Sequence, residues 1–290
     1  MYTSVIVPGP NDVPGREVAG IEDVATPPQT EPARERVITA AEVAAAIAPG
    51  SCVGVGGSGL ARKPLALVRA LAQAGVRDLD LWTGVGGLEV EVLLAAQAVG
   101  HLHATYVGLE AVGLAPLFRR AREEGRLAFD EWSEWTLIAA LRAGAEGAPF
   151  APVRAGLGSD VAAGHADWRP FASPLDGEPL LAVPPVRPQV ALLHVDVATR
   201  DGRAYVLGDS HCDRLWALAA ERVFVSAERV EGAAWEPPQG LRAPVAWGGA
   251  VAGVVYAPGG ARPGGIAPWY RPDPDAVRAL CQELAEVVTA

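Results

Sequence analysis

Residues 52–73, CVGVGGSGLARKPLALVRALAQ, set the fold class of this chain. The apolar start, which contains Val53 and Val55, has the length and composition of a buried strand, and it runs directly into glycines. Pro64 then opens a segment whose apolar side chains recur at helical spacing, which predicts an amphipathic helix. A strand, a glycine-rich turn and a helix in this order are typical of an α/β protein with a parallel sheet.

The rest of the chain repeats this alternation. Thr39 and Glu42 have the spacing of a capping box and begin a helix that ends at Pro49. Asp273 and Pro274 begin a final helix in a similar way. Further helices are expected at about 64–75, 90–99, 116–124, 132–143 and 213–220, and strands at 52–55, 79–82, 101–109, 127–129, 180–183, 190–197, 204–207, 223–225 and 251–256. The pattern predicts one α/β domain with an open, mostly parallel sheet and helices on both faces.

The first 36 residues differ in composition from the remainder. They hold six prolines and show no sustained helical or strand period. Prolines also interrupt the place where a signal peptide would need its apolar stretch. We therefore expect residues 1–36 to form a flexible leader and residues 37–290 to form the folded domain.

Composition excludes several classes of function. Acidic residues outnumber basic ones by 34 to 24, which gives a net charge of −10, and no cluster of lysine and arginine is present to follow a phosphate backbone. No apolar run reaches the roughly 18 residues that a membrane helix needs. The three cysteines have neither CxxC nor metal-ligand spacing. We expect a cytoplasmic protein that binds neither nucleic acid nor membrane.

Residues 54–59, GVGGSG, match the dinucleotide-binding pattern GxGxxG. That mechanism also needs an acidic residue at the end of the second strand, but Asp78 and Asp80 stand at its start and Trp82 near its end. The nicotinamide interpretation is therefore disfavoured. Two interpretations of the glycines stay open: a loop that lets an anion or acyl group approach the backbone, or a purely structural tight turn.

Four segments of the chain resemble the α subunits of class I coenzyme A transferases. They are residues 38–71 (ITAAEVAAAIAPGSCVGVGGSGLARKPLALVRAL), 141–161 (LRAGAEGAPFAPVRAGLGSDV), 173–202 (SPLDGEPLLAVPPVRPQVALLHVDVATRDG) and 254–263 (VVYAPGGARP). Within that family the chain is most similar to glutaconate transferase α chains and to α chains of hydrolases that open a steroid-derived ring as a CoA thioester. Ser58 stands where the family usually has phenylalanine. The resemblance implies the NagB/RpiA/CoA transferase-like fold.

The resemblance also implies a partner chain. Class I transferases attack the thioester with a glutamate, which two-chain members usually carry in a Ser-Glu-Asn-Gly motif on the β chain. The only asparagine here is Asn11, in the leader, so that motif is absent from this chain. The catalytic carboxylate comes either from the partner or from another residue of this chain.

Glu110 is the catalytic candidate on this chain. It follows the predicted strand at 101–109, at the carboxyl end where open parallel sheets bind ligands. By resemblance, the ring-opening hydrolases carry an acidic residue in a corresponding place. A glutamate there can act as a base toward water or an acidic C–H, or as a nucleophile. The alternative is a solvated carboxylate at a strand end.

Substrate-binding candidates come from two glycine-rich segments and one histidine. The first segment supplies Gly56, Gly57, Ser58, Gly59 and Arg62, and the second, RAGLGSD, supplies Arg154, Gly156, Gly158, Ser159 and Asp160; His211 is the single candidate outside them. Arg154 is suited to hold a substrate carboxylate, but an internal ion pair with Asp160 is the alternative. Arg62 and Lys63, which flank the start of the predicted helix, could reach a thioester or a phosphate, but they are equally consistent with surface cations. The remaining histidines, including His101 and His103, are assigned structural or surface roles, and no metal site is expected.

Together these observations predict the α subunit of a two-chain enzyme, αβ or α2β2, that acts on acyl-CoA thioesters. It either transfers CoA between carboxylic acids or hydrolytically opens the ring of a cyclic CoA ester. Coenzyme A would enter as part of the substrate, with no bound cofactor. The alternative is a noncatalytic acyl-binding scaffold whose β chain carries the catalytic glutamate.

Overall fold

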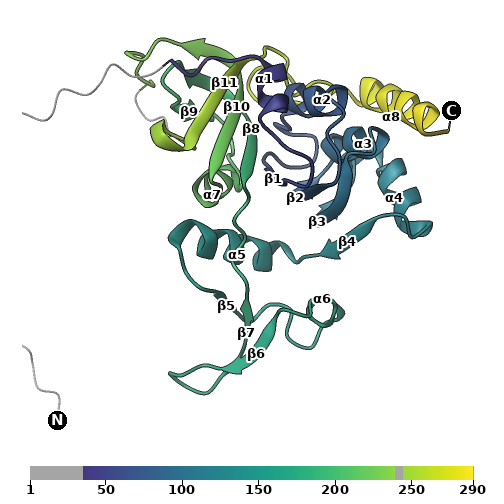
Figure 1. Cartoon of the computed structure of the whole chain (residues 1–290), viewed down its shortest axis with the longest axis vertical. Coiled ribbons are helices and arrows are strands. Elements are labelled where there is room, and N and C mark those ends of the chain that lie inside the picture. The colour runs from purple at the N-terminus through teal and green to yellow at the C-terminus, as the bar shows by residue number, and fades with distance from the viewer. Residues whose placement is uncertain (1–34, 239–243, 290) are drawn as a thin grey trace, which may run out of the picture. The chain divides into compact units, whose positions relative to one another are not determined.

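The computed structural model describes residues 35–238 and 244–289, and its centre is an eight-stranded sheet (Figure 1). The strand order is β11-β10-β8-β1-β2-β3-β4, and β9 pairs with β8. Every pairing in this sheet is parallel except the short antiparallel ladder of β8 and β9. The strands are β1 (Cys52–Val55), β2 (Leu79–Gly86), β3 (Val99–Val107), β4 (Ala128–Glu131), β8 (Val190–Thr199), β9 (Ala204–Tyr205), β10 (Arg222–Glu231) and β11 (Val251–Tyr256). The predicted mostly parallel sheet is confirmed.

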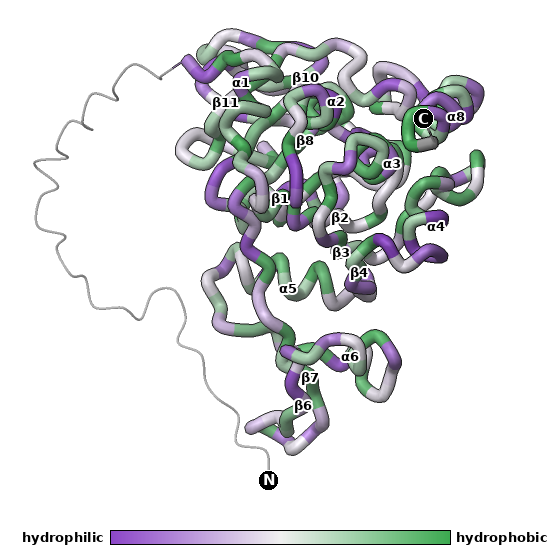
Figure 2. The backbone as a smooth tube through the Cα atoms, turned by 45° about the vertical axis from the view of Figure 1, so that its right-hand side comes forward, coloured by the Kyte–Doolittle hydropathy of each residue, from purple (hydrophilic) through white to green (hydrophobic). Residues whose placement is uncertain are grey.

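Helices cover both faces of the sheet, and each face buries its own core. Along β8, Val190 and Leu192 pack into one core while Ala191 and Leu193 pack into the other. Alternate residues of a strand point to opposite faces, so a strand covered on both sides is apolar throughout. The first core includes residues of α1 (Ala40–Ala45), α2 (Leu65–Gln73), α3 (Leu88–Ala95), α4 (Pro116–Glu123) and α8 (Pro274–Thr289), and the second includes residues of α5 (Glu134–Glu146) and α7 (Asp213–Ala219). Figure 2 shows the hydrophobic character of α5.

A second, three-stranded sheet was not predicted. It is antiparallel, with the order β5-β7-β6, and consists of β5 (Ala151–Val153), β6 (Arg169–Ala172) and β7 (Pro179–Val183), with α6 (Asp160–Gly164) between β5 and β6 in the chain. The strand expected at 180–183 is part of this sheet rather than of the main one. Its strands are three to five residues long and each contains a proline, so periodicity gives almost no signal.

The local helix signals predicted starts better than ends. Thr39 and Glu42 form the full capping box of α1, and Asp273 accepts the N–H of Ala276 at the start of α8. The helix expected at 90–99 is wrong at both ends, because α3 runs from Leu88 to Ala95 and Val99 already belongs to β3.

The described chain enters the domain before residue 37. The Arg36 N–H donates to the Arg200 carbonyl at 2.8 Å, and the Arg36 carbonyl accepts from Val254 N at 2.8 Å. Arg36 therefore belongs to the folded body, while residues 1–34 of the expected leader lie outside the described residues. In the part of the chain that is described, no helix combines the length and the apolar character needed to cross a membrane.

Candidate active site

The glycine loop begins where β1 ends, and neighbouring atoms leave no room for side chains at Gly56, Gly57 and Gly59. A Cβ on Gly56 would lie 2.5 Å from Leu193 Cδ2 and 2.6 Å from Asp213 Oδ1. Gly57 has a φ of +72°, and a Cβ there would lie 2.5 Å from the Ala61 carbonyl oxygen. Steric exclusion and a positive φ both require glycine here.

The N–H groups of this loop are engaged within the protein. Each residue from Gly56 to Arg62 donates its backbone N–H to a protein oxygen; the acceptors are the carbonyls of Leu192, Ala61, Val85, Ser58 and Gly265 and the carboxylates of Asp213 and Glu110. The loop is therefore a satisfied tight turn. In this conformation it presents no free N–H groups to an anion, and the space beside Gly56 and Gly57 is filled by protein atoms, so of the two open interpretations the hydrogen bonds favour the structural tight turn.

Glu110 lies against this loop. The strand expected to reach residue 109 ends at Val107, and Glu110 instead begins a short 3₁₀ turn with a φ of +52°. Its Oε1 accepts the Leu60 N–H at 2.8 Å, and a Cβ on Gly59 would lie only 2.3 Å from the same oxygen. The residue is nevertheless exposed. The structure thus brings together the catalytic candidate and the glycine loop at the carboxyl end of the sheet.

A pocket at the same end joins the loop to His211. Its walls come from the ends of β2 and β3, from α5 and from the start of α7; the lining residues are Gly57, Ser58, Gly84, Val85, Thr105, Glu134, Leu137, Ile138, Leu141, His211, Cys212 and Trp216. Burial raises the pKa of the Cys212 thiol to about 11, so Cys212 is protonated at neutral pH and is a poor nucleophile.

The family follows from comparison with known proteins. A family model for coenzyme A transferase matches residues 37–245. The chain belongs to the coenzyme A transferase family. It is 37% identical over 205 residues to the protein named cholesterol ring-cleaving hydrolase IpdA subunit of Rhodococcus jostii, a match that covers 68% of this chain and 69% of that protein.

Two further matches cover most of the chain. A 3-oxoadipate CoA-transferase subunit of Pseudomonas knackmussii is 32% identical over 213 residues, covering 72% of this chain and 74% of that protein. A solved structure of a variant of the decarboxylase AibA/AibB superposes with a TM-score of 0.78 at 30% identity, covering 88% of this chain and 97% of that one. The predicted family and its α/β fold are confirmed.

Two buried ion pairs stabilise the glycine loop of this family member. Arg62 pairs with Asp213, and Asp213 Oδ1 also accepts the Gly57 N–H at 2.8 Å. Lys63 Nζ lies 2.7 Å from Glu89 Oε1 and donates to Thr83 Oγ1 at 3.0 Å. The side chains of both pairs are at most 4% exposed, so the interpretation of Arg62 and Lys63 as surface cations is wrong.

Sequence reasoning missed the acidic partners of these cations. Asp213 follows Arg62 by 151 residues, so its contact depends on tertiary structure. The only local signal for a structural role of Asp213 was its position in the first turn of the predicted helix at 213–220, because helix starts favour acidic residues. That signal does not identify Arg62 as its partner. The paired Arg62 guanidinium contributes to the shape of the loop rather than presenting an exposed cation.

The RAGLGSD segment is not brought to this pocket. It belongs to the three-stranded sheet, where Arg154 forms a two-point ion pair with Glu178, with Nε to Oε1 at 2.6 Å. The alternative to a substrate-binding role, an ion pair of Arg154 with Asp160, is therefore wrong, and the Arg154 guanidinium lowers the pKa of the Glu178 carboxyl instead.

The other members of that segment shape a turn. Gly156 and Gly158 both have positive φ, of +87° and +71°. Ser159 caps α6 and donates to the Gly156 carbonyl at 2.8 Å. Asp160 lines a different pocket, shared with Arg122, Phe129, Asp130, Glu131, Val161, Gly164 and His165. The two glycine-rich candidates thus occupy separate sites, and only the first adjoins Glu110.

Proposed function

We propose that this chain is the α subunit of a two-chain enzyme that acts on acyl-CoA thioesters, and that the reaction is hydrolytic opening of the ring of a cyclic CoA ester. The name of the Rhodococcus jostii relative, a ring-cleaving hydrolase subunit, supports the reaction class. The observation that carries the proposal is the position of the Glu110 carboxylate, exposed at the glycine loop and held by the Leu60 N–H.

Hydrolysis of a carbon–carbon bond needs a base to activate water and a carbon that can receive the electron pair of the broken bond. Glu110 takes a proton from water as the water oxygen adds to a ring carbonyl carbon. The adjacent C–C bond breaks, its electron pair passes to the carbon next to the thioester carbonyl, and that carbon takes up the proton that Glu110 accepted from water, which regenerates the carboxylate. The products are one carboxylic acid group and an intact thioester. Coenzyme A enters and leaves as part of the substrate, so the scheme uses no resident cofactor.

The proposed partner is a β subunit of the same family, in an αβ or α2β2 complex. Its support is that the curated relatives are named as subunits. A cytoplasmic location remains a prediction from the sequence.

CoA transfer is the second candidate, and the 32% identity to a 3-oxoadipate CoA-transferase subunit favours it. In that case the attacking glutamate is on the β chain, and Glu110 supports binding only. The two reactions differ in the fate of water. Hydrolysis places one oxygen from water in the new carboxyl group, whereas transfer requires an acceptor acid and moves coenzyme A to it.

The test is turnover of CoA esters by the complex with its β chain in ¹⁸O-labelled water, with and without acceptor acids. Glu110→Gln keeps the shape of the side chain and removes its basicity. It should lower hydrolytic turnover by about two to four orders of magnitude. Glu123→Gln, at an exposed glutamate paired with Arg119, is the matched control and should retain turnover. Unchanged turnover in Glu110→Gln would assign the chemistry to the β chain.

A further inference from the structure

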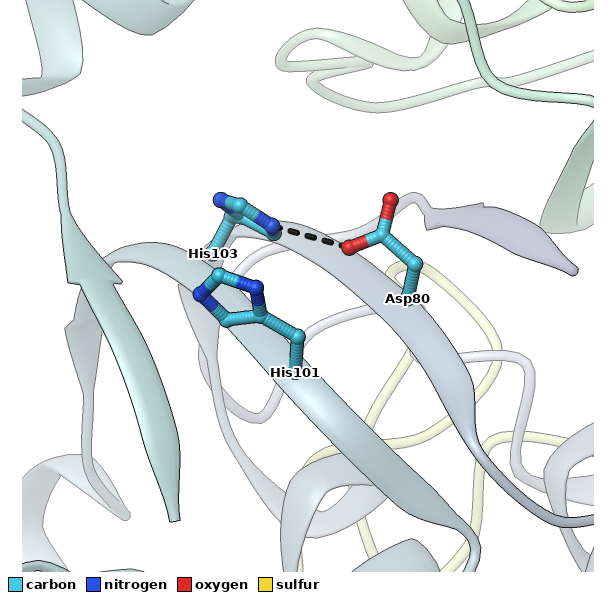
Figure 3. A group of neighbouring side chains, drawn as sticks. All are labelled: Asp80, His101 and His103. Atoms are coloured by element: carbon cyan, nitrogen blue, oxygen red, sulfur yellow. Dashed lines mark hydrogen bonds and ion pairs between the residues drawn. The ribbon is translucent and has the colours of Figure 1, made fainter. Parts of the chain in front are cut away.

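A cluster of two histidines and two aspartates lies on three neighbouring strands, away from the glycine loop. Asp80 of β2 is the register partner of His101 on β3, and His103 on β3 is the register partner of Asp130 on β4. His101 and His103 are two residues apart on one strand, so both side chains project from the same face. Figure 3 shows both imidazoles beside the Asp80 carboxylate.

The donor atoms of this cluster converge. One ligand atom from each of Asp80, His101 and His103 lies within 4.8 Å of the others. Asp80 Oδ1 lies 2.8 Å from His103 Nε2. Donors around a tetrahedral zinc ion are spaced by roughly 3.3 Å, as follows from metal–ligand distances of about 2.0–2.2 Å. Modest rotations of side chains that are more than a third exposed, as those of Asp80 and His101 are, bring three donors to that spacing.

Asp130 lies within ion-pair distance of both imidazoles. Its Oδ2 lies 3.2 Å from His101 Nε2 and 3.2 Å from His103 Nδ1. A carboxylate that contacts one nitrogen of each ring leaves the second nitrogen of each, His101 Nδ1 and His103 Nε2, for a metal. Metal-binding histidines commonly direct their other ring nitrogen to a carboxylate in this way.

Neighbouring aromatic and polar groups anchor one side of the cluster. Trp82 stacks on His103, with ring centroids 3.9 Å apart and planes within 6°, and its Nε1 donates to Asp80 Oδ2 at 3.1 Å. The side chain of His103 is 10% exposed, while those of Asp80, His101 and Asp130 are 35–38% exposed. The site is therefore anchored on one side and open to solvent on the other, which gives an ion an entry path.

We propose that Asp80, His101 and His103 bind one divalent transition-metal ion such as Zn²⁺, with Asp130 as the outer carboxylate that positions both histidines. Imidazole and carboxylate donors suit zinc and its neighbours in the first transition series. His103 lies four residues before the end of β3, roughly 13 Å along the strand from it. Because Glu110 lies beyond that end, the ion joins β2 and β3 and stabilises the sheet rather than taking part in the chemistry.

The test is calorimetric titration of the chelator-treated full chain with ZnCl₂, with Co²⁺ absorption as a second probe of coordination. We expect one ion per chain, visible d–d bands with Co²⁺, and a Zn²⁺-dependent rise in melting temperature. His101→Ala and Asp80→Asn should each weaken binding by more than tenfold, and Asp130→Asn by about tenfold to a hundredfold, the effect typical of an outer-shell partner.

The matched control is His211→Ala, which removes another histidine that lies beside an aspartate, 3.8 Å from Asp209. It should leave Zn²⁺ affinity unchanged. Circular dichroism without metal identifies any variant that fails to fold, and His101→Gln, at a half-exposed position, is the milder replacement. Absence of stoichiometric binding, or equal affinity in wild type, His101→Gln and Asp80→Asn, would overturn the proposal.

Discussion

The contact between Gly59 and Glu110 gives a test of the candidate active site that leaves Glu110 itself in place. Gly59→Ala would put a Cβ 2.3 Å from Glu110 Oε1 and 3.1 Å from its Cδ, so the carboxylate must move. Displacement of a catalytic group by about 1 Å can cost about a hundredfold in rate. We therefore expect turnover by the α/β complex to fall by about two orders of magnitude.

The same substitution also has a backbone cost, which a second glycine can measure separately. Gly59 has a φ of +55°, and an alanine in the left-handed region costs about 1–2 kcal/mol. Gly75, which follows α2, has a φ of +69° with no atom within 4 Å of an added Cβ. Gly75→Ala should therefore lower the melting temperature by a similar few degrees and leave turnover intact.

The assay is the rate of CoA-ester consumption at matched complex concentration, with melting curves for each variant. Gly59→Ala should cause no further loss in a Glu110→Gln background, because both changes act on the same carboxylate. If Gly59→Ala and Gly75→Ala retained the same turnover, the position of Glu110 would not matter to the reaction, and the reasoning would be refuted.

Two further predictions concern buried charges elsewhere in the fold. Asp213→Ala leaves the Arg62 guanidinium buried without its partner and should lower the free energy of unfolding by about 3–5 kcal/mol. Asp213→Asn should lower it less, and chemical denaturation measures both variants. A loss below about 1 kcal/mol, as for a surface ion pair, would contradict the pairing. Burial acts to raise the pKa of the Glu228 carboxyl, but hydrogen bonds from His194 and Tyr270 outweigh burial and hold that pKa below its ordinary value of 4.5. The stability that the ionised carboxylate contributes is therefore present above that ordinary value and is lost as the pH falls through the lowered pKa. Between about pH 5 and pH 3 the wild type should therefore lose more stability than Glu228→Gln; parallel pH curves for the two proteins would show that the expected coupling is absent.

Local sequence signals predicted the elements that build the site. The strand at 52–55, the glycines after it and Pro64 are determined by nearest neighbours in the chain, and the structure has them as expected. The rule that parallel strands end at one edge placed Glu110 with the glycine loop. The hydrogen bond from Leu60 to Glu110 spans 50 residues and depends on a turn with positive φ, so no local pattern indicated it.

The missed side-chain contacts of the described chain depend on tertiary structure, and for the histidine cluster the deciding feature is strand register. His101 and His103 have the i, i+2 spacing of one strand face, and that spacing was visible in the sequence. Their convergence with Asp80 and Asp130 depends on how β2, β3 and β4 align, and register follows from the pairing of whole strands. A similar dependence on tertiary structure holds for the ion pair of Arg62 with Asp213, which joins the glycine loop to a helix 151 residues later.

The hydrogen bonds of the glycine loop bear on why such an enzyme would need two chains. Both acyl transfer and hydrolytic C–C cleavage build negative charge on a carbonyl oxygen, and donors aimed at that charge usually supply the largest part of the rate enhancement. The backbone N–H groups from Gly56 to Arg62 are already committed to oxygens of this chain, and Leu60 N donates its hydrogen bond to Glu110 itself. The loop therefore positions the Glu110 carboxylate but does not serve as an oxyanion hole in this conformation. We infer that the charge-stabilising donors come from the partner chain, which predicts that the isolated α chain binds CoA esters without turning them over.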